Sequence, residues 1–263
     1  MSDVEVAAVL SRVVEPLGTL VVTGGSRGIG AAICVAAAAD GWDVVVDFVR
    51  DESAAAVVVD RIEAAGGRAL AVRADVADPD DVRRLVDSAA QWRGPLRGLV
   101  NNAGITGGQA RVDQLGEEAL TEVLATNVAG PFRCAGEAVR RMSTRYGGTG
   151  GAIVNVSSRA ARLGSPGEWV HYAASKAALD TLTVGLAREV ATEGVRVNAV
   201  AVGLVDTELH AAAGDPGRPD RMRPTIPMQR SGTPEEVAEA VRWLLSPAAS
   251  YTTGTILAVS GGR

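Results

Sequence analysis

The sequence predicts an α/β fold in which about seven parallel strands form one doubly wound sheet with helices on both faces. Short apolar runs that are typical of strands alternate with helical patterns along most of the chain. The 263 residues are 47% apolar, which is enough to fill one continuous core. Aromatic residues make up only 3%, and the abundant small side chains suit close packing of helices on a sheet.

The first half of the chain contains four expected strands, each followed by helical sequence. Strands are predicted at 19–23, 43–48, 68–74 and 97–101, and helices at 28–40, 53–65, 80–92, 117–127 and 131–146. Gly66 and Gly67 end the second of these helices, and Asp78 with Pro79 begins the third. This alternation is the pattern of a parallel sheet with right-handed crossovers.

The second half continues the alternation. Strands are expected at 152–156, 195–200 and 255–259, and a long helix at 171–192. A further helix begins at Thr233-Pro234-Glu235-Glu236, a capping box with Pro in the first helical position. The sequence has neither an internal repeat nor a linker. We therefore expect residues 1–263 to form a single domain, with residues 1–18 as an N-terminal extension.

Residues 203–232 do not fit the alternation and are rich in Pro, Ala and Arg. They follow the carboxyl end of an expected strand, where doubly wound sheets bind ligands, so we predict a substrate lid. Its arginines Arg218, Arg221, Arg223 and Arg230 fit either an anionic-substrate site or a solvated basic loop. We interpret them as a solvated loop.

The net charge and the first residues of the sequence limit which binding partners and which cellular location we expect for the protein. A formal net charge of −5 and a pI of about 5.2 leave no basic surplus for nucleic acid or an anionic membrane. Asp3 and Glu5 stand where a secretory signal needs positive charge, and no apolar run reaches the ~20 residues that cross a bilayer. We expect a cytoplasmic protein without a membrane span.

Cysteine and histidine are too sparse for a metal site. Cys34 and Cys134 fall in apolar helical patterns with no His or second Cys at ligand spacing, so we expect two buried free thiols. His171 and His210 are the only imidazoles in the chain. No metal is predicted.

A glycine-rich loop, TGGSRGIG, joins the first strand to the first helix. Glycines before a helix N-terminus let the backbone approach a pyrophosphate, whose charge the helix attracts. A lone glycine loop is also compatible with a tight turn, but its place in the first strand–helix unit favours a dinucleotide. The predicted binding residues are Thr23, Gly24, Ser26, Arg27, Gly28, Ile29 and Gly30.

The loop TGGSRGIG resembles the TGxxxGxG cofactor loop of short-chain dehydrogenases/reductases. Asp75-Val76 resembles the pair that borders the adenine in that family, and Asn101-Asn102-Ala103-Gly104 resembles its NNAG signature. The resemblance runs from about Leu20 to the end of the sequence and is to the compact, single-domain group that includes 3-oxoacyl-carrier-protein reductases and glucose 1-dehydrogenases. It implies a Rossmann-type fold, a homotetramer, and an NAD(P) cofactor that Asp75, Val76, Asn102, Ala103 and Gly104 help to bind.

The end of the second strand distinguishes NAD from NADP, because a carboxylate there accepts bonds from a ribose 2′-hydroxyl and repels a 2′-phosphate. Asp47 is one candidate for that carboxylate. The family register instead puts Phe48 at the deciding position, and strand alternation then turns Asp47 to the opposite face. Arg27 and Arg50 can pair with a phosphate. We predict NADP as the preferred cofactor and NAD as the alternative.

Tyr172 and Lys176 stand four residues apart at the start of the long helix, which places them on one helix face. The pKa of a free phenol is about 10, and an adjacent cation moves it toward the range of efficient proton exchange. Ser158 follows the fifth strand, where its hydroxyl can donate to a substrate carbonyl. Singly, these residues also fit an amphipathic helix face and an ordinary turn. Together they predict a catalytic site.

The family resemblance adds roles to these residues. It implies that Ser158, rather than Ser157, is the catalytic serine. It implies that Asn127 disrupts a helix and helps to hold a water-linked proton path to Lys176, and that Lys176 also hydrogen-bonds the nicotinamide ribose. Tyr172 is the general acid/base of this set.

The same resemblance places Gly203, Val205 and Thr207 at the nicotinamide end of the cofactor. The chain departs from the family pattern just before them, because Val202 stands where Pro is usual and the backbone loses a rigid φ. It departs again at 97–100, where the acid that is common before the NNAG signature is missing.

The resulting hypothesis is an NAD(P)-dependent oxidoreductase that interconverts a carbonyl and a secondary alcohol of a small molecule by hydride transfer. One alternative is a catalytically inactive NAD(P)-binding sensor of the same fold, since fold alone does not establish activity. A methyltransferase that uses S-adenosylmethionine is another, but it gives no reason for the Tyr172–Lys176 pair.

Overall fold

The computed structural model describes residues 17–207, 215 and 217–263. Most of the expected N-terminal extension, and residues 208–214 and 216 of the expected lid, lie outside this part of the chain. The described residues contain a seven-stranded sheet in the order β3-β2-β1-β4-β5-β6-β7. Every strand pair in it is parallel. The predicted fold class is confirmed.

The strands begin and end within two residues of their predicted bounds. They are β1 (Thr19–Val22), β2 (Asp43–Phe48), β3 (Arg68–Arg73), β4 (Leu96–Asn101), β5 (Gly151–Ser158), β6 (Val195–Val202) and β7 (Ile256–Val259). Because β1 lies between β2 and β4, the strand order reverses there. The loops after β1 and β4 therefore diverge and leave a crevice at the carboxyl ends of the strands.

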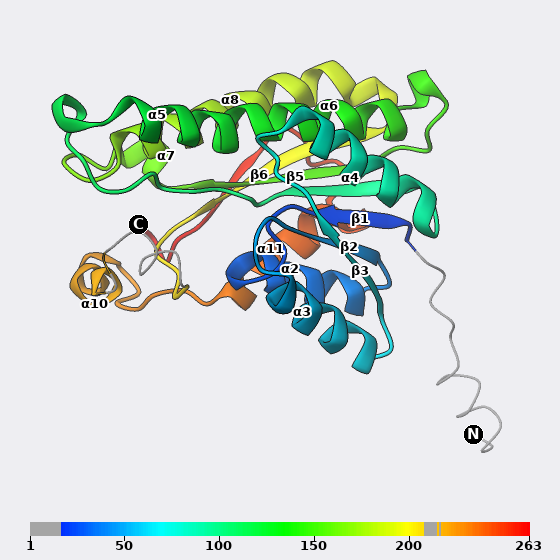
Figure 1. Cartoon of the computed structure of the whole chain (residues 1–263), viewed down its shortest axis with the longest axis horizontal. Coiled ribbons are helices and arrows are strands. Elements are labelled where there is room, and N and C mark those ends of the chain that lie inside the picture. Colours follow the sequence, from blue (N-terminus) through cyan, green and yellow to red (C-terminus); the bar gives the residue numbers. More distant parts are fainter. Residues whose placement is uncertain (1–16, 208–214, 216) are drawn as a thin grey trace.

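Helices cover both faces of the sheet (Figure 1). One layer contains α2 (Gly28–Ala39), α3 (Glu52–Ala64) and α11 (Pro234–Leu245), and the other contains α4 (Pro79–Trp92), α5 (Glu117–Leu124), α6 (Gly130–Met142) and α8 (Val170–Val190). Two short helices that the sequence pattern did not indicate, α7 (Ala160–Leu163) and α10 (Arg218–Met222), belong to the segments after β5 and β6. These segments contribute to the site described below.

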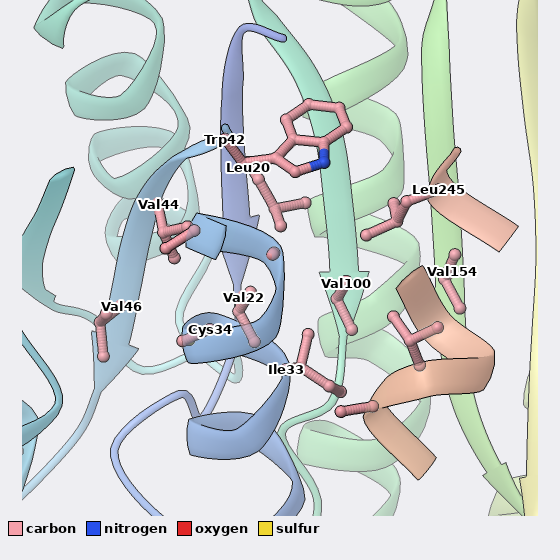
Figure 2. Packing of buried hydrophobic residues seen from close by; sticks show 14 of the residues in the cluster. Leu20, Val22, Ile33, Cys34, Trp42, Val44, Val46, Val100, Val154 and Leu245 are labelled. Atoms are coloured by element: carbon pink, nitrogen blue, oxygen red, sulfur yellow. The ribbon is translucent and has the colours of Figure 1, made fainter. Parts of the chain in front are cut away.

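Alternate residues of β1 point to the two helical layers. Leu20 and Val22 belong to a cluster that includes Ile33 of α2 and Leu245 of α11 (Figure 2). Val21 belongs to a second cluster, against α4, α6 and α8. All three β1 residues are fully buried. With both faces covered, β1 is apolar throughout, and the core on either side holds the loop that follows it in place.

Two predicted helices end three or more residues earlier than expected. The helix predicted at 117–127 stops at Leu124, and residues Ala125–Ala129 form a π-helical turn that leads into α6. The helix predicted at 131–146 stops at Met142, because Ser143 leaves the helical conformation with a ψ of 133°. The Ser143 hydroxyl then accepts a hydrogen bond from the backbone N–H of Arg145. In both places the apolar periodicity of the sequence continues past the structural break.

The helix after the predicted lid begins at the predicted capping box. Thr233 Oγ1 accepts a hydrogen bond from the Glu236 N–H at 3.3 Å, and the Glu236 carboxylate accepts from the Thr233 N–H at 2.9 Å. The chain therefore enters α11 at a well-defined residue.

Both cysteines and one histidine are buried in the described part of the chain. Cys34 and Cys134 are buried free thiols, as predicted. His171 Nε2 lies 2.7 Å from the carbonyl oxygen of Thr106, and His210 is outside the described residues. In the described part of the chain, no group of three or more His, Cys, Asp or Glu side chains is placed to hold a metal ion. None of the helices described combines the length and hydropathy that a membrane span requires.

Candidate active site

A cavity of about 550 Å³ lies at the carboxyl ends of the central strands. Its lining contains all of the predicted site residues except Thr23 and Asn127: Gly24, Ser26, Arg27, Gly28, Ile29, Gly30, Phe48, Arg50, Asp75, Val76, Asn102, Ala103, Gly104, Ser158, Tyr172, Lys176, Gly203, Val205 and Thr207. Segments from many parts of the sequence thus meet at one rim of the sheet.

Thr23 lies directly behind the lining and joins the ends of β1 and β4. Its buried Oγ1 accepts hydrogen bonds of 3.0 Å from the backbone N–H groups of Asn102 and Ala103. The Asn102 side chain donates in return to the carbonyl oxygens of Thr23 and Gly24, at 2.8 and 3.0 Å. The NNAG segment therefore holds the glycine loop open toward the cavity.

The glycine loop requires its glycines. Gly24 and Gly28 have φ angles of +61° and +53°, which favour glycine. A Cβ at Gly30 would lie 2.3 Å from the carbonyl oxygen of Gly24, a distance that no side chain tolerates. The resulting bare backbone at the N-terminus of α2 fits a dinucleotide pyrophosphate.

Asp47 lies beneath this loop and not in the cavity lining. It is 1% exposed, and its Oδ2 accepts a 3.0 Å hydrogen bond from the Gly24 N–H. Burial raises the pKa of Asp47 to about 7, although hydrogen bonds to the carboxylate act in the opposite direction. Phe48 and Arg50 line the cavity instead, as the strand register predicted, together with Asp51.

Asn127 lies in the π-helical turn and is completely buried. Its Oδ1 accepts from the Ile105 N–H at 2.9 Å, and its Nδ2 donates to the Ile105 carbonyl at 2.8 Å and to Ser175 Oγ at 3.0 Å. A Cβ at Gly104 would lie 3.3 Å from both Asn127 Oδ1 and Lys176 Nζ. Asn127 therefore supports the floor of the cavity next to Lys176.

Tyr172 and Lys176 share one face of α8, as the spacing predicted. Lys176 is 4% exposed, its Nζ lies 5.7 Å from the centre of the Tyr172 ring, and it donates a 2.9 Å hydrogen bond to the carbonyl oxygen of Val156. Burial lowers the pKa of Lys176 to about 8, and the nearby Asp180 carboxylate opposes that shift. The ammonium is thus held against β5.

The expected direction of the Tyr172 pKa shift is wrong for this structure. Burial raises the pKa of the phenol, whereas a hydrogen bond with Ser158 and the charge of Arg218 lower it to a smaller extent. The expectation considered only the nearby ammonium and omitted the desolvation that comes with burial of the phenol. The phenol therefore keeps its proton at neutral pH.

The two serines at the end of β5 have different surroundings. Ser158 hydrogen-bonds Tyr172 and lines the cavity, and its Oγ also accepts from the Ala160 N–H at 3.1 Å. The buried Ser157 Oγ instead donates to Asp180 Oδ1 at 2.6 Å. Only the Ser158 hydroxyl is placed beside the phenol.

Three of the four arginines in the predicted lid are exposed to solvent, as we interpreted them from the sequence. Arg221, Arg223 and Arg230 have side chains that are about half exposed or more, and each pairs with a carboxylate. Arg218 is different, because it is 8% exposed and lines the cavity. Its position in α10 turns it inward, and the sequence pattern contained no signal for this short helix.

Sheet order, glycine loop and cavity together define the class of protein, a Rossmann-type protein that binds NAD(P). Residues 24–263 match the family model described as enoyl-(acyl carrier protein) reductase. The chain is 52% identical to the uncharacterized oxidoreductase YgfF of Escherichia coli K12, over 92% of this chain and 98% of that protein. It is 37% identical to the 3-oxoacyl-[acyl-carrier-protein] reductase FabG of Staphylococcus aureus, over 92% of this chain and 96% of that one.

Comparison with solved structures identifies proteins of the same kind. A short-chain dehydrogenase from Burkholderia cenocepacia J2315 in complex with NADP superposes with a TM-score of 0.86 at 37% identity, covering 95% of this chain and 98% of that one. The chain belongs to the short-chain dehydrogenase/reductase family of NAD(P)-dependent oxidoreductases.

Proposed function

We propose that this oxidoreductase interconverts a carbonyl and a secondary alcohol, with Tyr172 as the general acid/base. The observation that carries the proposal is that Ser158, Tyr172 and Lys176 line the same cavity as the glycine loop. A substrate carbonyl in that cavity can meet two hydroxyl groups and the reacting end of a dinucleotide.

In the proposed reaction, Ser158 and Tyr172 act together in the transfer of one proton to the substrate oxygen. A bound nicotinamide supplies the hydride that the carbonyl carbon accepts. Ser158 and Tyr172 donate hydrogen bonds to the carbonyl oxygen and polarise the bond. Tyr172 then gives its proton to that oxygen, which becomes the alcohol hydroxyl, and oxidation of an alcohol uses the same groups in reverse.

The charge of Lys176 supports this assignment. Tyr172, whose pKa burial raises, is protonated before reduction begins. Lys176, with a pKa of about 8, is mainly charged at pH 7. We propose that Lys176 hydrogen-bonds the nicotinamide ribose, and that Asn127 helps to hold the water-linked path that returns a proton to Tyr172.

NADP is the proposed cofactor, with NAD as the alternative. Arg27 and Arg50 line the cavity on the side of Phe48, where a 2′-phosphate would need positive charge. The carboxylate of Asp47 is engaged by Gly24 below the loop. The NADP in the Burkholderia structure at 37% identity supports the same choice.

The proposal also covers the domain organisation, the assembly and the location of the protein. We propose that the chain is a single domain that works as a cytoplasmic homotetramer on a small-molecule substrate, and that residues 203–232 form its substrate lid. Val205 and Thr207 of this segment line the cavity together with Arg218. Closure of such a segment would exclude water from the reacting carbonyl.

A panel of ketones, aldehydes, secondary alcohols and acyl thioesters, followed by nicotinamide absorbance with NADPH and NADH, tests the function. Reduction of a carbonyl supports it. Calorimetric binding of NADPH without turnover of any compound would instead support the inactive sensor. Reduction of an enoyl thioester at its C=C bond, with no carbonyl turnover, would support the activity in the family model's description.

A further inference from the structure

One corner of the cavity is built from Trp169 and Arg218. The two residues come from segments 49 positions apart, and both line the cavity. They are 4% and 8% exposed, and the Arg218 guanidinium stacks over the Trp169 ring, 4.5 Å from its centre. Glu168 Oε2 accepts a 2.7 Å hydrogen bond from one terminal nitrogen of Arg218. The stack and the ion pair hold the guanidinium in a defined orientation.

This corner contains two buried donors that are not used. Arg218 Nε and Trp169 Nε1 have no hydrogen-bond partner among the described residues. A buried donor without an acceptor destabilises the fold, so proteins rarely keep two such donors together without a purpose. Both donor atoms are covered by neighbouring atoms at the edge of the cavity, and a ligand whose acceptor oxygens displaced this cover would satisfy them.

The charge around the corner is positive. Arg263 also lines the cavity, and Arg159 Nε donates to its carbonyl oxygen at 2.7 Å. Arg218 lowers the pKa of Arg263 by repulsion, in addition to a larger effect of burial, and Glu168 opposes both. Arg218 and Arg263 thus lie near one carboxylate, that of Glu168, and the surplus positive charge favours an anionic ligand.

We propose that this corner binds the carboxylate of the substrate, so that the enzyme acts on oxo acids or the corresponding hydroxy acids. Arg218 Nε–H and Trp169 Nε1–H donate to the carboxylate oxygens, and the guanidinium supplies the charge. The inference rests on the proposed carbonyl–alcohol function and names its substrate class. The charge of Arg218 also reaches the phenol of Tyr172, so the corner lies close to the reacting carbonyl.

The test compares oxo acids with their methyl esters. A 2-oxo, a 3-oxo and a 4-oxo acid, each with its ester, are reduced with NADPH, and kcat/KM is measured for every compound. We expect kcat/KM for at least one acid to exceed that for its ester by about 10- to 100-fold, since only the acid completes the charge-assisted hydrogen bonds. The spacing of the preferred acid shows how far the carbonyl lies from the corner.

For each variant, kcat/KM for the acid is divided by kcat/KM for its ester. Because both values come from the same protein preparation, any loss of folded enzyme cancels in this ratio. Arg218→Met alone would leave Glu168 facing the substrate, so it is combined with Glu168→Gln. In this double variant the ratio should fall to about 1. Trp169→Phe keeps the ring under Arg218 but removes the N–H, and should lower the ratio by a smaller factor. The matched control is Arg223→Met, an exposed arginine five residues along the chain, which should leave the ratio unchanged.

Three outcomes would overturn the inference: acids and esters reduced equally well by the wild type, a ratio that survives in R218M/E168Q, or an acyl thioester preferred over every oxo acid. If neither acids nor esters turn over, the proposed function fails, and calorimetry with 4-oxopentanoate then tests whether the corner binds a carboxylate. Binding of 4-oxopentanoate by the wild type but not by R218M/E168Q would support this carboxylate site. Equal binding by both proteins would refute it.

Discussion

The ammonium of Lys176 donates a 2.9 Å hydrogen bond to the carbonyl oxygen of Val156, two residues before Ser158. This contact joins the start of α8 to the end of β5 and thereby holds Tyr172, Lys176 and Ser158 around one cavity. Asp180, one turn further along α8, accepts from Ser157 of the same strand. The helix and the strand are therefore connected by polar contacts at the two residues that precede the proposed catalytic serine.

The reduction rate should decrease as the pH rises through about 8, because Lys176 loses its charge there. Asp180→Asn removes the anion that raises the pKa of Lys176, so the alkaline limb should move to lower pH. Asparagine keeps an oxygen for the Ser157 hydroxyl. Profiles of kcat/KM against pH measure the limb, with Asp60→Asn on α3 as the control. An unchanged limb in D180N would contradict the assignment to Lys176.

Tyr172→Phe removes the transferable proton and keeps the ring. We expect kcat to fall by at least about 100-fold, because general acid catalysis contributes that much or more. The Kd for NADPH should change by less than about twofold, since the phenol is not a main cofactor contact. Tyr146→Phe, at an exposed tyrosine, is the matched control. Normal turnover by Y172F would refute the proposed role.

Arg50→Ala should weaken NADPH more than NADH. Loss of one charge-assisted contact to the 2′-phosphate is expected to raise the KM for NADPH by about tenfold and to leave the KM for NADH nearly unchanged. Arg83→Ala, an exposed arginine on α4, controls for the change in net charge. A wild-type enzyme that turns over faster with NADH than with NADPH would show that the register at Phe48 was misread.

Gly30→Ala should abolish tight cofactor binding. The added Cβ would lie 2.3 Å from the Gly24 carbonyl oxygen and 2.6 Å from Asn102 Nδ2, so the loop must move. We expect the Kd for NADPH, measured by calorimetry, to rise by at least about tenfold. Gly185→Ala lies in α8 with open space around it and should leave the Kd unchanged. Wild-type affinity in G30A would mean that the loop does not contact the cofactor.

Asp47 should make folding stability depend on pH. Its pKa is about 7 in the folded protein, compared with about 4 in an unfolded chain. The folded state therefore holds the proton at pH 5, and that contribution to stability is lost as the pH rises through 7. Relative to Asp47→Asn, which does not titrate, the wild type should lose on the order of 2 kcal/mol of unfolding free energy between pH 5 and pH 8. Urea unfolding at both pH values measures it, and parallel changes in the two proteins would contradict the burial of an ionisable Asp47.

Most of the cavity could be predicted because its cofactor-binding part is local in sequence. A pyrophosphate is recognised by contiguous backbone, so TGGSRGIG in one strand–helix unit was a sufficient signal. The i,i+4 spacing of Tyr172 and Lys176 was equally local. The family register placed Phe48 toward the cavity, and alternation in β2 then turned Asp47 away from it, as the structure shows.

The positions that hydropathy patterns did not indicate depend on partners far away in sequence. The break at Asn127, which only the family resemblance implied, is accompanied by bonds to Ile105 and Ser175, which are 22 and 48 residues distant. Arg218 differs from Arg223 because Glu168 and Trp169, about 50 residues earlier, draw it into the cavity. No pattern of hydropathy along one segment contains such pairings.

The sequence by itself determined the order of strands and helices, the family and the bare backbone of the glycine loop, because periodicity and glycine placement act over a few neighbouring residues. The tertiary structure alone decided which arginine of the predicted lid enters the cavity and in which direction the pKa of the phenol shifts. Those properties come from burial and from contacts between distant segments, which exist only once the chain has folded.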